Sequence, residues 1–397
     1  MLKTSLQAAF FFKVIFMSDF VLNSLPNLVI ASYSSSRLGQ YALNYGNRFM
    51  LIMDPVLRAV GLAEKITSSL SDRNVDYFVF DSLSETADAK TVNSALELAR
   101  SSHVQGIICF GGGKAFSVAR CTASLFFEAD GVYEFLDGKK IEKKPLPLIC
   151  LNSTCRDPFI FTDFVPVVDS RSNQTKLIKV QPELCKALLF DPILSVTFTE
   201  NQKDTMTLES ICLALEGFLS QKSSFFTEMT AEKSMEQLKN VINKDEVLSS
   251  VPAEEFLVQG GVLASLCAGS SGIGVASLLA LTINSRYKVG HALVSAILLP
   301  YIIEEYAKFK LEQTASIGRI LFPSEKNSSS ETAVKVFAES IREFLAKKNL
   351  PTRLKELSVT IEQLSLAVED AARLDFMNGL PKSMTAEELF EIVKNAW

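Results

Sequence analysis

The first half of the chain alternates short apolar runs with amphipathic stretches of helical spacing. Strands buried on both faces of a parallel sheet form such continuous apolar runs, and a helix usually connects each strand to the next. The alternation therefore predicts an α/β domain built on a parallel sheet. The predicted strands are residues 49–53, 77–80, 106–110, 146–151 and 187–190, and the predicted helical stretches include 56–70, 95–99 and 115–127.

After about residue 200 the pattern becomes helical throughout. Leu208, Ile211, Cys212 and Leu215 fall on one face of a helix. We therefore predict an N-terminal extension at 1–21, the α/β domain at 22–200 and an all-helical domain at 201–397. Three largely apolar segments fit the central helices of a bundle: 256–267, 275–282 and 293–309.

Several later helices carry a recognisable start signal. A serine or threonine three residues before a glutamate or glutamine can form a capping box, because each side chain satisfies a free backbone amide of the first turn. The predicted boxes are Ser328 with Glu331, Thr360 with Gln363, and Thr385 with Glu388.

Charge and cysteine content narrow the partners and the compartment. The 397 residues carry 40 basic and 45 acidic side chains, a net charge of −5, which argues against a nucleic-acid partner. Seven cysteines without a Cys-x-x-Cys pair argue against a disulfide framework and a zinc ribbon. The N-terminal stretch partly resembles a signal peptide, but Lys13 interrupts it, and Met17 is an equally plausible start. No apolar run reaches the length of a membrane helix, so we expect a cytoplasmic protein.

A run of glycines gives the clearest chemical signal. Gly111, Gly112, Gly113 and Lys114 follow a predicted strand and precede a predicted helix. Glycine lets the backbone approach an anion closely, and the helix N-terminus offers free N–H groups. The segment therefore predicts binding of a phosphate, most naturally the diphosphate of a dinucleotide, although a tight turn without a ligand would also use glycine.

Asp54 ends the first predicted strand and is followed by Pro55. An acidic side chain at that place could accept hydrogen bonds from a ribose diol. It could equally cap the next helix, in which Pro55 would take the first position. Both interpretations remain open from the sequence.

Taken in order, five segments resemble the motifs of the iron-containing alcohol dehydrogenase family, which shares its architecture with glycerol dehydrogenase and dehydroquinate synthase. The resemblance covers nearly everything after about residue 22. It implies a dehydrogenase that uses NAD or NADP and often a divalent metal, and it implies a homodimer. The segments are 111–120, 191–194, 291–300, 374–382 and 395–397.

The same alignment shows that the metal ligands of the family are mostly replaced. The family holds its metal with one aspartate and three histidines, whereas this chain has only His103 and His291. Glu209 falls at the aspartate position and Ser277 at one histidine position, leaving His291 as the one retained ligand. Leu213 falls at the first of the three histidine positions, and Leu281 falls where many members of the family place a further histidine near the substrate. We therefore expect no tight iron or zinc site, with Glu209, Ser277 and His291 as residual positions, and interpret His291 as opening a buried helix.

The nucleotide loop is altered too. Ser153 and Thr154 align with the two threonines that begin the family's loop along the nucleotide. Both glycines of that loop are gone, and Pro158 and Phe159 make it stiffer and bulkier. Arg156 could reach a phosphate or pair with the neighbouring Asp157 in solvent.

These departures leave two functions to weigh. The first is an NAD(P)-dependent alcohol or aldehyde oxidoreductase that does not depend on a metal, with Lys114 or Arg156 as candidates to stabilise an alkoxide. The alternative is a catalytically inactive relative that serves as a nucleotide-binding or protein-interaction subunit. A lyase like dehydroquinate synthase also needs a metal and histidines, so the loss of those ligands disfavours a lyase as well.

Overall fold

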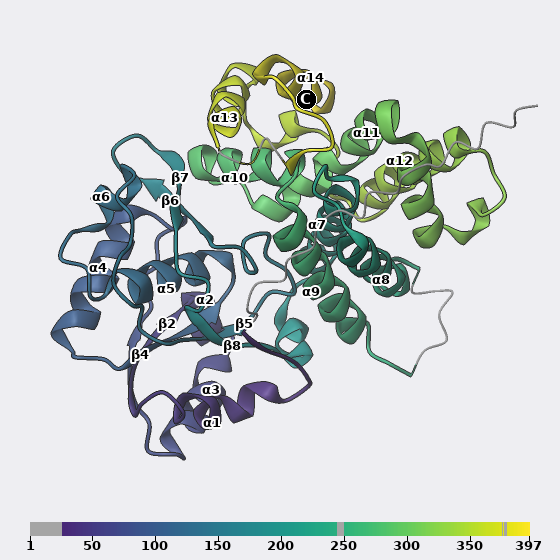
Figure 1. Cartoon of the computed structure of the whole chain (residues 1–397). Helices are drawn as coiled ribbons and strands as arrows, with labels where there is room; N and C mark the ends of the chain where they lie inside the picture. Colours follow the sequence, from purple (N-terminus) through teal and green to yellow (C-terminus); the bar gives the residue numbers. More distant parts are fainter. Residues whose placement is uncertain (1–25, 244–249, 375, 377–378) are drawn as a thin grey trace, which may run out of the picture.

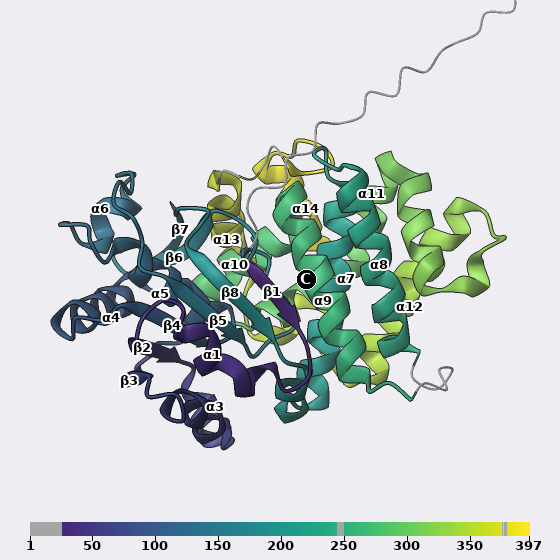
Figure 2. The same ribbon diagram turned by 60° about the horizontal axis from the view of Figure 1, so that its bottom comes forward.

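The computed structural model describes residues 26–243, 250–374, 376 and 379–397. The α/β part, purple to teal in Figure 1, is built on one six-stranded sheet in which every neighbouring pair is parallel. The strand order is β1-β8-β5-β4-β2-β3 (Figure 2). A parallel sheet of this kind was predicted from the alternating apolar runs. The strands are β1 (Asn27–Ile30), β2 (Arg48–Met53), β3 (Asp76–Phe80), β4 (Gly106–Gly111), β5 (Leu148–Asn152) and β8 (Cys185–Phe190).

Helices cover both faces of this sheet (Figure 2). Alternate residues of β2 enter different cores: Phe49 and Leu51 pack with the side of α1 and α3, and Met50 and Ile52 pack with the side of α4 and α5. Period-two alternation of side chains explains why a strand buried on both faces is apolar at every position. The helices are α1 (Leu38–Ala42), α2 (Pro55–Ala59), α3 (Leu62–Ser71), α4 (Ala89–Ser101), α5 (Gly113–Leu125) and α6 (Val132–Leu136).

Two parts of this domain differ from the prediction. The single helix expected over 56–70 is wrong, because it breaks into α2 and α3 at Gly61, whose φ of 74° lies in the left-handed region. The short edge strand β1 and a separate antiparallel pair, β6 (Phe164–Asp169) with β7 (Gln174–Lys179), were not predicted. These strands are part polar or interrupted by Pro166, so they lack the continuous apolar run that identified the others.

The second half folds as a helical domain beside the sheet. Its helix α7 packs against α8, α9, α10 and α11, and α13 and α14 lie over one end of this group (Figure 1). The helices are α7 (Glu200–Leu219), α8 (Phe225–Ile242), α9 (Ala253–Ser271), α10 (Val275–Tyr287), α11 (His291–Leu321), α12 (Ser330–Lys347), α13 (Ile361–Arg373) and α14 (Ala386–Ala396).

The capping signals are confirmed at two of three helices. Thr360 and Thr385 each form the predicted reciprocal box. The prediction for Ser328 is wrong by one residue: Ser329 caps α12 and accepts a hydrogen bond from the Thr332 amide at 3.2 Å. Ser328 instead donates its hydroxyl to the carbonyl of Glu325 at 2.8 Å, which completes the preceding turn.

Three other expectations concern the N-terminus, the cysteines and membrane-spanning helices. The N-terminal extension 1–21 and both candidate start residues lie outside the described residues. All seven cysteines are free. In the described part of the chain, no single helix has the length and apolar composition to cross a membrane, although α9 and α10, bent by 99°, pass such a test as a pair.

Candidate functional site

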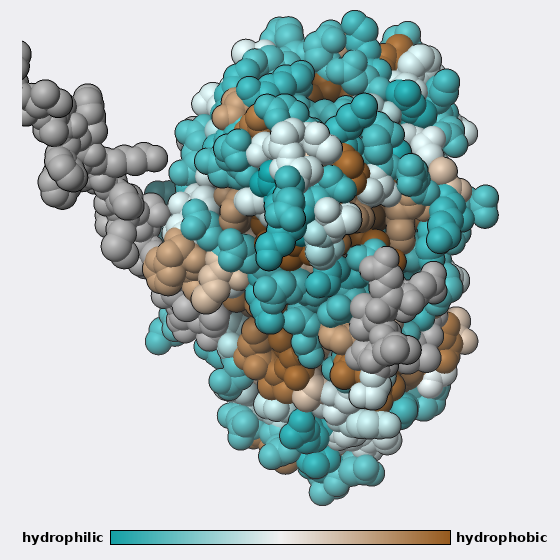
Figure 3. All heavy atoms as spheres, turned by 90° about the vertical axis from the view of Figure 1, so that its right-hand side faces the viewer, coloured by the Kyte–Doolittle hydropathy of each residue, from teal (hydrophilic) through white to brown (hydrophobic). Residues whose placement is uncertain are grey.

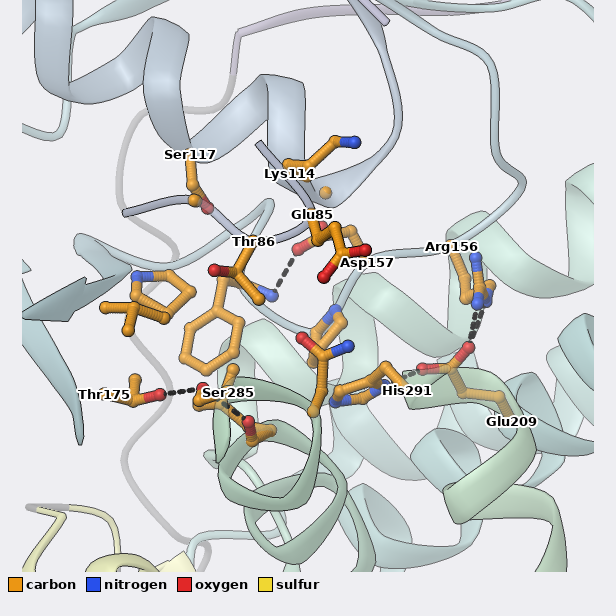
Figure 4. A pocket seen from close by; sticks show the side chains of 18 residues that line it. Glu85, Thr86, Lys114, Ser117, Arg156, Asp157, Thr175, Glu209, Ser285 and His291 are labelled. Carbon is orange, nitrogen blue, oxygen red and sulfur yellow. Dashed lines mark hydrogen bonds and ion pairs between the residues drawn. The ribbon is translucent and has the colours of Figure 1, made fainter. Parts of the chain in front are cut away.

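A cavity of about 260 Å³ lies where the α/β part meets the helical domain. It adjoins the carboxyl ends of the strands, which is where ligands bind in open α/β sheets. Its apolar wall residues include Pro158, Phe159 and Leu281, and ten of its polar ones are labelled in Figure 4. Its charged or titratable side chains are Glu85, Lys114, Arg156, Asp157, Glu209 and His291.

Three of these side chains form one hydrogen-bonded cluster, drawn with dashed lines in Figure 4. Arg156, from the loop after β5, donates from Nε and Nη2 to Oε2 of Glu209 on α7. The other oxygen of Glu209 lies 2.5 Å from Nδ1 of His291, the first residue of α11. The Glu209 side chain is only 2% exposed, so this carboxylate depends on its two partners.

The partners set the charge state of the cluster. Burial by itself raises the pKa of Glu209, but Arg156 and His291 outweigh it and hold that pKa below its ordinary value. Burial likewise opposes the charge of Arg156, and Glu209 again outweighs it, so the pKa of the guanidinium is raised. The pair is therefore a charged guanidinium on a charged carboxylate.

Ser277 takes part in a different arrangement. Its hydroxyl donates to Glu216 Oε2 at 3.0 Å, and the Ala276 amide donates to the other oxygen at 2.7 Å. Glu216 of α7 thus closes the N-terminus of α10 from outside the helix. Burial raises the pKa of Glu216 to about 7, against the hydrogen bonds from Ala276 and Ser277 that lower it. Ser277 offers His291 only its backbone carbonyl, 3.3 Å from Nε2.

These residues do not fit a divalent metal ion. The carboxylate at the acidic position, Glu209, is already held by a guanidinium cation, and a metal there would meet a like charge. The Ser277 hydroxyl is turned to Glu216, and Leu213 is a buried aliphatic side chain. Among the described residues no group of three histidine, cysteine or acidic side chains is arranged to hold a metal.

The glycine segment forms the turn from β4 into α5. Gly111 ends the strand, Gly112 is the N-cap and Gly113 is the first helical residue, with no side chain capping the helix. The Ser153 amide donates to the Gly111 carbonyl at 3.0 Å, which ties this turn to the loop after β5. A Cβ on Gly112 would lie 3.0 Å from Cγ2 of Thr154. A Cβ on Gly111 would lie 2.6 Å from Cβ of Ala115, so the residues that crowd this turn belong to the chain itself.

The remaining candidate, Asp54, sits beside this turn. It is the N-cap residue of α2 and Pro55 is the first helical position, but the Asp54 side chain makes no capping hydrogen bond. Its Oδ1 lies 4.0 Å from Nζ of Lys114. Lys114 lines the cavity, whereas Asp54, Gly111, Gly112, Ser153 and Thr154 are not part of its wall.

The loop after β5 makes contacts that the sequence did not predict. Arg156 does not pair with Asp157 in solvent: both are inside, and Arg156 reaches α7 instead. Arg120 donates to the carbonyls of Phe164 and Phe159, at 2.9 and 3.2 Å, so it holds this loop. The contact between positions 156 and 209 has no local sequence signal, because the loop and α7 meet only through the tertiary fold. The interpretation of His291 as a helix opener is confirmed, but it also lines the cavity.

Comparison with known proteins places the chain among dehydrogenases. The sequence model described as "Iron-containing alcohol dehydrogenase" matches residues 26–192, and that of the C-terminal part of the same family matches 204–397. The chain is 17% identical over 374 residues to NAD-dependent methanol dehydrogenase of Bacillus methanolicus, covering 94% of this chain and 98% of that protein. It is 19% identical to 1,3-propanediol dehydrogenase of Citrobacter freundii, covering 89% and 92%.

Solved structures give the same result for the fold. A crystal structure of 1,3-propanediol oxidoreductase superimposes with a TM-score of 0.86 at 18% identity, covering 96% of this chain and 100% of that one. Sulfoacetaldehyde reductase from Bifidobacterium kashiwanohense, solved in complex with NAD⁺, superimposes with a TM-score of 0.80 at 17% identity, covering 95% and 98%.

Proposed function

Because the chain belongs to the iron-containing alcohol dehydrogenase family, we propose that it is an NAD- or NADP-linked oxidoreductase that works without a bound metal. The ion pair of Arg156 with Glu209 is the observation that supports activity without a bound metal. A guanidinium that holds the acidic position supplies a fixed positive charge in place of a metal cation. No step of the proposal passes through a metal.

The dinucleotide fits the glycine turn in its chemistry. Gly111, Gly112 and Gly113 bring backbone N–H groups to the start of a 13-residue helix, and Lys114 adds a charge facing the cavity. Bound there, NAD(P) would supply the acceptor or donor of a hydride. Ser153, Thr154 and Asp54 are proposed to support this turn from the next strand ends.

Residues of the cavity would then stabilise the charge of the reacting oxygen and exclude water. Arg156 provides the positive charge that stabilises a developing negative oxygen, as a preorganised group that needs no reorganisation. Glu209 fixes the guanidinium and His291 in place, and the apolar wall at Phe159 and Leu281 excludes water. Substrates would be alcohols or aldehydes small enough for a cavity of about 260 Å³.

Thermal unfolding of purified, metal-analysed protein tests this proposal, with and without NAD⁺, NADH, NADP⁺ and NADPH. A ligand at ~100 times its Kd adds about 2.7 kcal/mol to the free energy of unfolding, a shift of several degrees. A shift with one nucleotide, followed by turnover of an alcohol or aldehyde in metal-free buffer, supports the proposal. If the Gly112→Asp variant binds the nucleotide with unchanged affinity, the glycine turn is not the nucleotide site.

A second candidate is a catalytically inactive, nucleotide-binding or protein-interaction subunit. It is favoured by the loop after β5, in which Pro158 and Phe159 replace smaller residues and Asp157 enters the cavity. A nucleotide shift without turnover of any substrate would favour this candidate.

Assembly and location are proposed from the family and the composition. We propose a homodimer in the cytoplasm, without nucleic-acid or membrane partners; the seven free cysteines suit a reducing compartment. Light scattering on a sizing column tests the dimer, and a monomeric mass would contradict it.

A further inference from the structure

The glycine turn is already in contact with a carboxylate of the chain itself. Asp157 is only 8% exposed. Its amide donates to the Ser265 hydroxyl at 2.9 Å, and its Oδ1 accepts from the Phe159 amide at 2.7 Å. A Cβ on Gly113 would overlap Oδ2 of Asp157, so this oxygen occupies the space that the missing side chain leaves free.

This space is where an anion would bind the turn. The first turn of α5 has no side-chain cap, so its amides are available to a negative group approaching Gly113. Among the hydrogen bonds of the described residues, those to the Asp157 carboxylate come from its own loop and none comes from α5. In Figure 4, Asp157 points into the cavity near Lys114.

We propose that Asp157 determines the nucleotide affinity and selectivity of this site: its carboxylate stands beside Gly113 where a ligand phosphate would lie, and it disfavours ligands in proportion to their phosphate charge. The inference rests on the proposed nucleotide function of the glycine turn. Asp157 belongs to the altered loop after β5, and its carboxylate opposes the phosphate that the glycine turn would otherwise attract.

The surroundings make the charge of Asp157 costly rather than neutralised. Burial raises its pKa, although the Phe159 amide, Arg120, Arg156 and His291 act in the opposite direction. Arg120 donates to carbonyls of the loop and Arg156 donates to Glu209, and among the described residues neither guanidinium has a hydrogen bond to the Asp157 carboxylate. A phosphate against Gly113 would therefore meet a buried like charge beside the positive charge of Lys114, which also lines the cavity. Like charges ~5 Å apart at the dielectric constants of a protein surface change an affinity by about tenfold or more.

The test compares the whole protein with Asp157→Asn, which removes the charge and keeps an oxygen for the Phe159 amide. Isothermal titration calorimetry measures the Kd of NAD⁺, of ADP-ribose, and of adenosine as a probe without phosphate. We expect Asp157→Asn to bind NAD⁺ and ADP-ribose about tenfold more tightly, with adenosine unchanged. Asp157→Ser is the second variant, should the first fold poorly. Asp163→Asn is the matched control, because it removes a charge from the same loop outside the cavity wall.

The outcomes separate this inference from the function on which it rests. Equal Kd values for the wild type and both Asp157 variants overturn the inference and leave nucleotide binding intact. An equal gain for adenosine also overturns it, since the effect would not depend on phosphate. Absence of binding in the wild type and in every variant overturns both.

Discussion

Arg156 donates two of its guanidinium N–H groups to one oxygen of Glu209, across a sequence separation of 53 residues. The other oxygen of Glu209 holds His291. The side chains of Arg156 and Glu209 are 12% and 2% exposed, so water screens the pair little. This ion pair joins the loop after β5 to α7 across the interface of the two parts.

Removing Arg156 should destabilise the fold strongly. Arg156→Met leaves the buried Glu209 carboxylate without its main cation, and breaking a buried pair costs about 3 kcal/mol or more in the free energy of unfolding. Arg373→Met is the control, because Arg373 is 67% exposed and pairs with the exposed Glu369; less than about 1 kcal/mol is expected there. Urea denaturation measures both, and equal losses would contradict the account.

The loss should be recoverable by removing the charge of the partner. The double variant Arg156→Met with Glu209→Gln carries no unpaired carboxylate, so it should regain part of the stability lost in Arg156→Met. A double variant no more stable than the single one would mean that packing of the arginine stem, not charge, explains the loss.

Glu216 should make stability depend on pH. Its pKa is about 7 in the folded protein, against an ordinary 4.5, so folding favours the protonated form. Its contribution is fully present below pH 4.5 and is lost as the pH rises through 7, by at most about 3 kcal/mol. Relative to Glu216→Gln, the wild type should therefore lose stability over this window. The exposed Glu343→Gln serves as control, and parallel curves for wild type and Glu216→Gln would refute the assignment.

Gly261 of α9 should be intolerant of any side chain. A Cβ there would lie 2.5 Å from the carbonyl oxygen of Cys155, next to Arg156. Gly261→Ala must displace that loop and should cost about 1–3 kcal/mol. At Gly290 nothing lies within 4 Å, so Gly290→Ala should change stability far less. Thermal unfolding of the two variants tests this difference. Similar unfolding midpoints would contradict the close contact of Gly261 with the Cys155 carbonyl.

The start of α12 can be checked in the same way. Ser329→Ala removes the oxygen that accepts the Thr332 amide and should cost about 1 kcal/mol. Ser328→Ala removes only a bond to the Glu325 carbonyl and should cost less. The reverse order would mean that the helix begins at Ser328.

The sequence predicted what local pattern can encode. Continuous apolar runs identified the central strands, and Thr360 and Thr385 marked helix starts, because both signals lie within a few neighbouring residues. The break at Gly61 was missed because the apolar spacing continues across it, while the left-handed backbone conformation is what ends the helix. Polar edge strands such as β7 carry too weak an alternation to be recognised.

The site was predictable only in its list of altered positions. The sequence placed Glu209 at the aspartate position of the family and His291 as the one retained histidine, and it placed Arg156 and Asp157 in a loop that has lost its glycines. The sequence could not show which residues Arg156 and Asp157 contact in the folded protein. Arg156 turns to Glu209 and Asp157 to Gly113 because the packing of the loop on α9 and α5 aims them there.

The most direct test of the central claim is the metal content of the wild-type protein. The protein is incubated with Fe²⁺ under nitrogen, or with Zn²⁺, then desalted and measured by inductively coupled plasma mass spectrometry. Because the Arg156 guanidinium already holds Glu209, the account predicts only traces of metal, far below the protein concentration. A stoichiometric metal that survives desalting and is lost in His291→Ala would contradict it.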